Sequence, residues 1–314
     1  MSAQDKPQLW IPYLVVIGMI AISFSAIFVR WSEAPASIIA MYRLLLTNVC
    51  MLPFIWRFIP EMRSLRLLDS FKLAASGAGL GLHFMFWMDS LNYTTVASST
   101  AILTLEPILV TIGAYMLFRQ KTGFVAQISM TVAIIGAICI GWGDFRFSGS
   151  ALHGDLLSFL STVAVAVHML LGKSLRARIS AFVYSFFVFL YAGGVLLVYN
   201  LALGSPLLGY PAREWGNFLL LAIVPTVFGH YIFNWLLKYM KTASVSMIVL
   251  GEPLGATLLA YMLLGERITL LQLGAGAILL VGVAFFLRSS EGEEPTPAGS
   301  AKQEPAAEPL RQTD

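Results

Sequence analysis

Ten long apolar runs constrain the fold of this chain more than any other feature of its sequence. Each run is about 20 residues long, which lets an α-helix cross the hydrocarbon core of a membrane. The runs are continuous and lack the alternation of half-buried strands, so helices are favoured. They fall at residues 11–29, 36–58, 71–91, 95–118, 124–142, 152–172, 180–203, 217–237, 242–264 and 270–288. The sequence therefore predicts an all-α membrane protein with ten transmembrane helices.

The composition excludes most other classes of protein. Of the 314 residues, 58% are hydrophobic and only 12% are charged, whereas a soluble domain carries roughly 25% charge. A soluble globule of this size would need far more polar surface. We therefore exclude a nucleic-acid-binding protein, a secreted disulfide scaffold and a coiled coil. Cys50 and Cys139 both lie in apolar runs and are expected to be packing residues.

The distribution of basic residues predicts an orientation in the membrane. If the N-terminus is cytoplasmic, fifteen of the 20 Lys and Arg residues fall on the cytoplasmic side, four fall on the other side, and Arg43 lies inside a run. We expect an inner (cytoplasmic) membrane protein with both termini in the cytoplasm. The first run has no cleavage site after it and is expected to be retained. Residues 289–314 are rich in Pro, Glu and Ala and are expected to form a disordered cytoplasmic tail.

The two halves of the chain resemble each other at a constant shift of 146 residues. Matched features include Glu106-Pro107 with Glu252-Pro253, the segments at 115–121 and 261–267, and Gly136 with Gly282. Ala97-Ser98 and Ala243-Ser244 match at the same shift. With one gap, HFMFW (83–87) matches HYIFNW (230–235). So many matches in the same order indicate an old duplication.

The duplication predicts two repeats of opposite orientation. Each repeat holds five predicted helices, and because five is odd, the second copy enters the membrane inverted. We expect a first five-helix repeat over residues 1–143 and a second over 144–288. Inverted repeats place a substrate site near the midplane between two bundles, and this arrangement favours a carrier that works by alternating access.

Residues 11–288 resemble the EamA-type members of the drug/metabolite transporter superfamily. The matching residues are Gly265, Glu266, Arg267, Thr269, Gln272, Gly274 and Gly282, together with Arg43, Arg30 and Lys173. The first repeat departs from the pattern, because Gln120 stands where the second repeat has Glu266. The resemblance implies a ten-helix fold and a secondary carrier, usually an exporter of small metabolites.

Two glutamates are the strongest candidates for a functional site. Glu106 and Glu252 lie near the middle of their runs, where an ionisable side chain is costly, and each precedes a proline that disrupts the helix. We expect kinks at Pro107 and Pro253, with freed carbonyls beside the carboxyls. The glutamates could bind a cationic substrate group or relay protons. Alternatively, they are protonated acids that hydrogen-bond a neighbouring helix.

Other candidates share these central positions. His83 and His230 match between the repeats and could carry protons, pair with the glutamates, or serve in packing. Arg43 could bind a substrate carboxylate or snorkel to the interface. Trp87 and Trp235 could line the site or act as packing residues and interface anchors.

Three further expectations complete the set. Asp89 and His168 lie near the ends of their runs and are expected at the interface. The sequence contains no HxxxH or HExxH spacing of the kind that indicates a metal site. The sequence also contains no phosphate-binding glycine loop that would indicate direct use of ATP.

The sequence therefore predicts a secondary active transporter, an exporter of a small metabolite such as an amino acid or its derivative. Its energy would come from ion or substrate gradients, with proton coupling as one route. Its partners would be the substrate, membrane lipid and protons, without cofactor or nucleic acid, and it would be a monomer or a homodimer. An embedded enzyme that uses the Glu and His side chains as acid and base, or a channel, are the alternatives.

Overall fold

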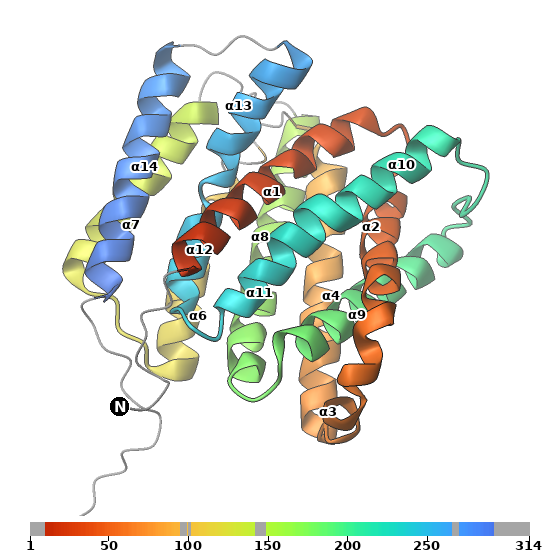
Figure 1. Cartoon of the computed structure of the whole chain (residues 1–314). Helices are drawn as coiled ribbons and strands as arrows, with labels where there is room; N and C mark the ends of the chain where they lie inside the picture. The colour runs from red at the N-terminus through yellow and green to blue at the C-terminus, as the bar shows by residue number, and fades with distance from the viewer. Residues whose placement is uncertain (1–9, 95–98, 100–101, 142–148, 266–269, 292–314) are drawn as a thin grey trace, which may run out of the picture.

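A bundle of helices makes up the part of the chain that the computed structural model describes, residues 10–94, 99, 102–141, 149–265 and 270–291 (Figure 1). Of these residues 84% are helical, and none of them forms a strand. Seven helical segments among them are long and apolar enough to cross a membrane: Ile11–Trp31, Ala36–Arg57, Gly149–Arg176, Ala181–Ala202, Ala212–Leu236, Thr242–Leu263 and Leu270–Ser289. The prediction of an all-helical membrane protein is confirmed.

Helices occupy each of the ten predicted ranges, although the range at 95–118 is described only in part. The elements are α1 (Ile11–Trp31), α2 (Ala36–Met51), η1 (Leu52–Arg57), α3 (Ile59–Arg63), α4 (Leu67–Ser90), α6 (Glu106–Phe118), α7 (Phe124–Gly141), α8 (Gly149–Arg176), α9 (Ala181–Ala202), α10 (Ala212–Leu221), η3 (Ala222–Tyr231), α11 (Ile232–Leu236), α12 (Thr242–Val249), α13 (Glu252–Leu264) and α14 (Leu270–Glu291). α6 and α7 are apolar but shorter than the seven candidate spans, and polar residues and glycines lower the hydropathy of α4. The count of ten crossings stays a prediction.

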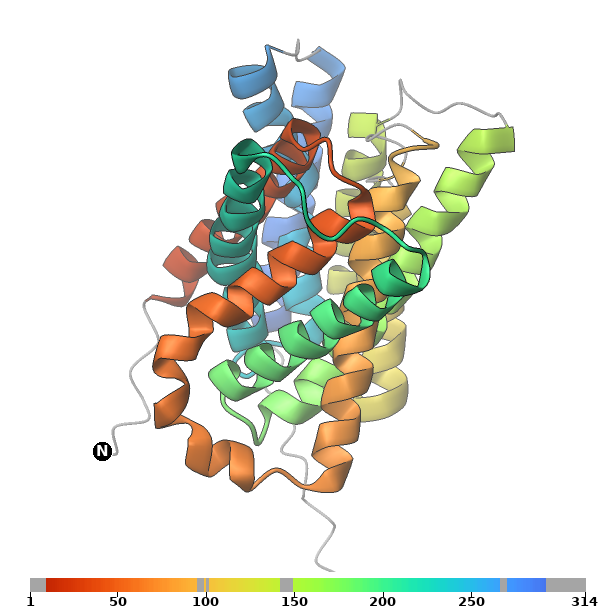
Figure 2. The same ribbon diagram turned by 90° about the vertical axis from the view of Figure 1, so that its right-hand side faces the viewer.

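Several predicted runs are not single helices. The run at 36–58 ends as an α-helix at Met51, and the chain turns through η1 and α3, each of which has a proline in its first turn. Figure 2 shows this segment passing from α2 to α4 across one end of the bundle. In the run at 217–237, ten residues form the wider π-helix η3, which contains Pro225. Proline lacks the N–H of a regular helix, and this removes one backbone hydrogen bond there.

Some predicted features lie outside the described residues. These are the expected tail after Glu291, the boundary between the repeats at 143/144, the Ala97-Ser98 pair, and Glu266, Arg267 and Thr269.

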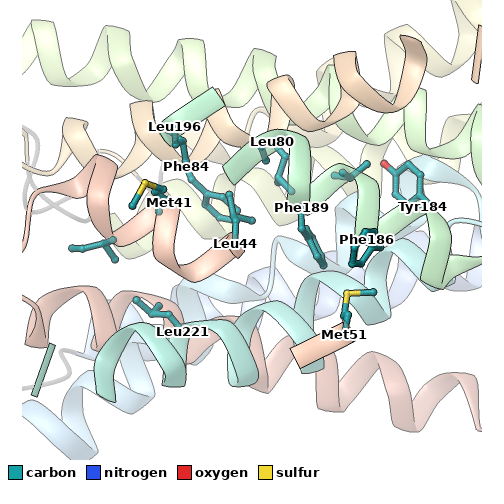
Figure 3. Packing of buried hydrophobic residues seen from close by; sticks show 14 of the residues in the cluster. Met41, Leu44, Met51, Leu80, Phe84, Tyr184, Phe186, Phe189, Leu196 and Leu221 are labelled. Carbon is teal, nitrogen blue, oxygen red and sulfur yellow. The ribbon is translucent and has the colours of Figure 1, made fainter. Parts of the chain in front are cut away.

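The largest apolar core lies between α2, α4, α9 and α10. Figure 3 shows Leu44 of α2, Leu80 and Phe84 of α4, and Phe189 of α9 packed against one another. Helices α4 and α9 approach closely because α4 has glycines at the contact. A Cβ atom at Gly77 would lie 2.6 Å from the Cβ of Tyr191. This core holds α4 in place, and α4 carries two of the predicted site residues.

Helices α7 and α14 lie side by side and pack through a reciprocal contact (Figure 1). A Cβ atom at Gly136 of α7 would lie 2.6 Å from the backbone nitrogen of Leu279, and one at Gly282 of α14 would lie 2.5 Å from that of Ala133. Gly136 matches Gly282 and Ala133 matches Leu279 at the shift of 146 residues. Each helix therefore presents its glycine to the equivalent position of the other.

We predict that Gly282→Ala destabilises the protein by about 1–3 kcal/mol, because its methyl group meets backbone atoms that cannot move aside. The measurement is the Tm of the purified protein in detergent, followed by tryptophan fluorescence. Gly274→Ala is the matched control in the same helix, since a Cβ atom there meets nothing within 4 Å, and alanine is the better helix former. Equal Tm values for the two variants would contradict the close contact.

Candidate functional site

An internal cavity of about 90 Å³ brings together most of the residues predicted from the sequence. Both glutamates, both matched histidines, Trp87 and both prolines line it. The remaining lining residues are mostly apolar or neutral polar: Ile22, Ser25, Phe84, Leu103, Thr104, Val165, His168, Met169, Phe233, Asn234, Leu237, Val245, Ser246, Val249 and Leu250. The cavity therefore has apolar walls and a small number of polar groups, as small-molecule sites do.

Glu106 and Glu252 each begin a new helix at this cavity. The regular helix is interrupted at both predicted kinks: Glu106 is the first residue of α6, and α12 ends at Val249, with two residues between it and the start of α13 at Glu252. The backbone at Leu105, Leu250 and Gly251 keeps right-handed helical dihedrals, so these are local irregularities in the helix. In both cases the proline lies in the first turn, where its missing N–H costs nothing. The N-terminus of a helix carries a partial positive charge, and a carboxyl group is favourable there.

The two glutamates differ in their partners. Glu106 is buried, and its Oε1 accepts a hydrogen bond of 2.7 Å from Ser246 Oγ of α12. Glu252 is only half-buried, and among the described residues no hydrogen bond joins its side chain to another. It interacts electrostatically with Arg43 and with Glu106. Glu252 therefore has the more available carboxyl group of the pair.

The two matched histidines flank one aromatic ring. Phe84 lies 5.0 Å from the ring centroid of His83 and 5.1 Å from that of His230. His83 is held by Ser161 of α8, whose Oγ lies 2.8 Å from His83 Nδ1. The structure thus joins the first half of the chain, at α4, to the second half, at η3, through Phe84.

Arg43 lies behind this ring and does not reach the interface. Its side chain is 0% exposed. Its Nε donates to Thr226 Oγ1 at 2.8 Å, its Nη1 donates to Ser25 Oγ at 2.9 Å, and its Cζ lies 4.1 Å from the centroid of Phe84. Within the described part of the chain its Nη2 has no hydrogen-bond partner. Arg43 is therefore a buried cation beside the cavity, separated from it by Ser25 and Phe84.

The two matched tryptophans lie in different surroundings. Trp87 is 4% exposed and lines the cavity. Trp235 does not line it; it packs between Trp10 and Tyr239, with ring centroids 4.8 and 4.1 Å away. Trp87 follows His83 by four residues, but Trp235 follows His230 by five. On a helix these spacings correspond to about 40° and about 140° of rotation, so only the first pair shares a face.

His168 was expected at the interface, and this expectation is wrong. It is 3% exposed, it lines the cavity, and its Nδ1 lies 2.9 Å from Ser76 Oγ. The physical reason is the length of α8, which continues to Arg176 beyond the predicted end at 172. Asp89, by contrast, is partly exposed near the end of α4 and accepts a hydrogen bond from Asn92.

Sequence reasoning missed the neutral polar groups in the cavity. Ser246, Asn234, Thr104 and Ser25 all line it, yet hydroxyl and amide side chains are common in membrane helices and none stood out by spacing. Among the described residues no cluster of three or more His, Cys, Asp or Glu side chains could hold a metal ion. The polar groups that line the cavity can form hydrogen bonds and charge pairs.

We predict that Ser246→Ala destabilises the protein by about 1–3 kcal/mol, since it leaves the buried Glu106 carboxyl without its donor. Ser244→Ala is the matched control, because Ser244 lies on the same helix and is also buried, but donates no described hydrogen bond to Glu106. Thermal unfolding in detergent measures both. A Tm for Ser246→Ala equal to that of Ser244→Ala would argue against the importance of this hydrogen bond.

A second prediction concerns the coupling between Arg43 and Glu252. We expect Arg43→Gln and Glu252→Gln to be non-additive, with a coupling energy of about 0.5–3 kcal/mol, because removing one charge leaves the other without its counter-charge. A double-mutant cycle on the Tm-derived stabilities gives this energy. Additive effects would mean that the two charges do not interact.

Comparison with known proteins identifies the family. The model of the EamA-like transporter family matches residues 9–142 and 152–288. A protein of Archaeoglobus fulgidus named "Uncharacterized transporter" is 24% identical over 279 residues, covering 87% of this chain and 95% of that protein. The "Uncharacterized transporter YdfC" of Bacillus subtilis is 23% identical over 284 residues, covering 88% and 90%. A solved crystal structure has a similar fold, with a TM-score of 0.76 at 15% identity over 90% of this chain and 98% of that one. Because the family model matches most of its length, this chain belongs to the EamA-like transporter family.

Proposed function

We propose that this protein is a secondary active transporter that moves a small polar metabolite through the central cavity by alternating access. The observation that carries the proposal is the lining of that cavity. Glu106 and Glu252, His83 and His230, and Pro107 and Pro253 are pairs matched between the two halves of the chain, and all six residues line the same space. Such a site lies between two halves that can move against each other.

The proposal includes ten transmembrane helices arranged as two inverted five-helix repeats, with the boundary at 143/144. The two separate family matches support a duplication. The reciprocal contact of Gly136 and Gly282 is what a two-fold relation between equivalent helices produces. In the proposed repeats, η3 corresponds to α4 and α1 corresponds to α8. The packing of α4 on α8 therefore has a counterpart in the packing of η3 on α1.

Broken helices at the cavity also favour a transporter. Interrupted helices whose N-termini point into a midplane site are typical of secondary transporters. The regular helix is interrupted just before Glu106 and just before Glu252, and both glutamates line the cavity.

The cavity's polar groups favour an amphipathic substrate with ionisable groups, such as an amino acid or its derivative. Glu252 offers an available carboxyl group to a cationic substrate group, and Arg43 lies beside the cavity with an unpaired Nη2 among the described residues. Phe84, Trp87 and Phe233 supply apolar walls. We further propose that transport is outward, from an inner membrane with both termini cytoplasmic, and that protons are exchanged through the glutamates and histidines that line the cavity.

The experiment is a search for a ligand followed by a transport assay. Purified protein is screened against metabolites for an increase in Tm, across a range of pH. A stabilising ligand is then labelled and tested in proteoliposomes for counterflow, which distinguishes a carrier from a channel. Saturable counterflow is expected. Flux without counterflow would contradict the carrier, and chemical conversion of the ligand would favour the alternative of an embedded enzyme.

We predict that Glu252→Gln reduces pH-driven accumulation of that ligand at least tenfold, because an amide cannot release a proton. Asp89→Asn is the matched control, a carboxyl-to-amide change outside the cavity lining, and is expected to leave accumulation unchanged. Undiminished pH-driven accumulation by Glu252→Gln would exclude Glu252 from proton coupling.

A further inference from the structure

A second space, about 360 Å³ in volume and separate from the central cavity, lies near the end of the bundle where α2 meets η1. No residue lines both spaces. This groove is walled by the end of α2, by η1, by the start of α9 and by η3. Its lining residues are Thr47, Cys50, Met51, Phe54, Arg57, Phe58, Phe182, Val227 and Tyr231.

The lining of the groove is mostly apolar and includes a single cation, Arg57. Phe58 stacks on Phe182 with ring centroids 4.2 Å apart and forms one wall. Arg57 is the only charged residue among those that line the groove, and its Cζ lies 5.2 Å from the ring of Trp56. Trp56 is 65% exposed. Exposed tryptophan beside arginine is typical of the membrane–water interface, so this part of the groove lies at headgroup level.

The flank of the groove faces hydrocarbon. Val49 of α2 and Phe228 of η3 neighbour groove residues in sequence and are 56% and 50% exposed. Large apolar side chains this exposed in a membrane helix contact lipid. The groove therefore runs beside lipid-facing surface from headgroup level towards the interior, which is the shape that one acyl chain requires.

The charges near the mouth favour an anion. Two acids lie in the same stretch of chain, but both have partners: Asp69 pairs with Arg178 at 2.6 Å, and Glu61 accepts a hydrogen bond from the Ser180 backbone N–H at 2.6 Å. Within the described part of the chain no carboxylate lies within ion-pair distance of Arg57. Arg57 is exposed and free to bind a phosphate.

We propose that this groove is a binding site for an anionic phospholipid, with its phosphate on Arg57 and an acyl chain along Met51, Phe54 and Phe182. The site depends on the proposed function only for placing this end at the cytoplasmic surface, where anionic lipids attract basic residues. Its occupant would contact residues of both α2 and η3, and so bridge elements of the two halves of the chain.

The test uses the full-length protein in detergent and needs no transport. Cys50 lines the groove, and Cys139 lies on α7, outside the groove lining. The rate of alkylation of each thiol by N-ethylmaleimide is measured by mass spectrometry, with added dioleoyl phosphatidylglycerol or dioleoyl phosphatidylcholine. Phosphatidylglycerol is expected to slow the reaction of Cys50 at least threefold relative to phosphatidylcholine, without changing that of Cys139.

Arg57→Gln is expected to raise the phosphatidylglycerol concentration for half-protection about fivefold, since one basic residue near the surface contributes about that much. Arg63→Gln is the matched control, an equal change of charge on the same exposed segment outside the groove, and is expected to stay within twofold of the native protein. Native mass spectrometry of the lipid retained by each protein gives a second measure of how the native protein and the two variants rank in affinity.

Three results would overturn the proposal. Equal protection and equal retention with both lipids would show that the site has no preference for an anion. An equal effect of Arg57→Gln and Arg63→Gln would show that the preference for the anionic lipid comes from general surface charge and not from Arg57. Protection by inorganic phosphate alone would show an anion site without lipid. Because none of these readouts involves flux, failure here is distinct from failure of the proposed transport.

Discussion

Charged side chains inside a membrane-spanning bundle need partners, and this requirement organises the centre of the protein. Arg43 has no route to water, so two hydroxyl groups and the face of Phe84 surround it. Glu106 is bonded by Ser246 and lies, like Glu252, at the start of a helix, where the backbone itself favours a carboxyl group. Around these groups the helices leave a cavity lined from both halves of the chain.

Some contacts between helices are tightly packed, whereas others leave a cavity. Where α7 meets α14, glycines let the two backbones touch, and no space remains for a ligand. Where α6 and α13 begin, the interrupted backbone and the prolines prevent such close packing, and the cavity forms beside the breaks. The groove near Arg57 arises in the same way, since α2 ends early at Met51 and the chain turns aside through η1.

The glutamates, the prolines and His83 could be found from the sequence because ionisable groups and prolines are rare in membrane helices. The glutamates and prolines match at a constant shift of 146 residues, and His83 matches His230 with one gap. Trp235 was misleading for a geometric reason. One additional residue in the second repeat turns that tryptophan away from the cavity, and the neighbouring Phe233 and Asn234 line it instead. His168 was missed because the end of an apolar run does not mark the end of a helix, and α8 continues past it.

The sequence by itself determined that this chain is helical and that it lies in a membrane. These follow from the length of the apolar runs and from the backbone's need for internal hydrogen bonds in hydrocarbon. Only the tertiary structure decided which faces meet. The pairing of Glu106 with Ser246, the burial of Arg43 against Phe84 and the mostly apolar groove that includes Arg57 join residues from different helices. The rotation of each helix about its axis sets those contacts, and it depends on packing against neighbours far away in the chain.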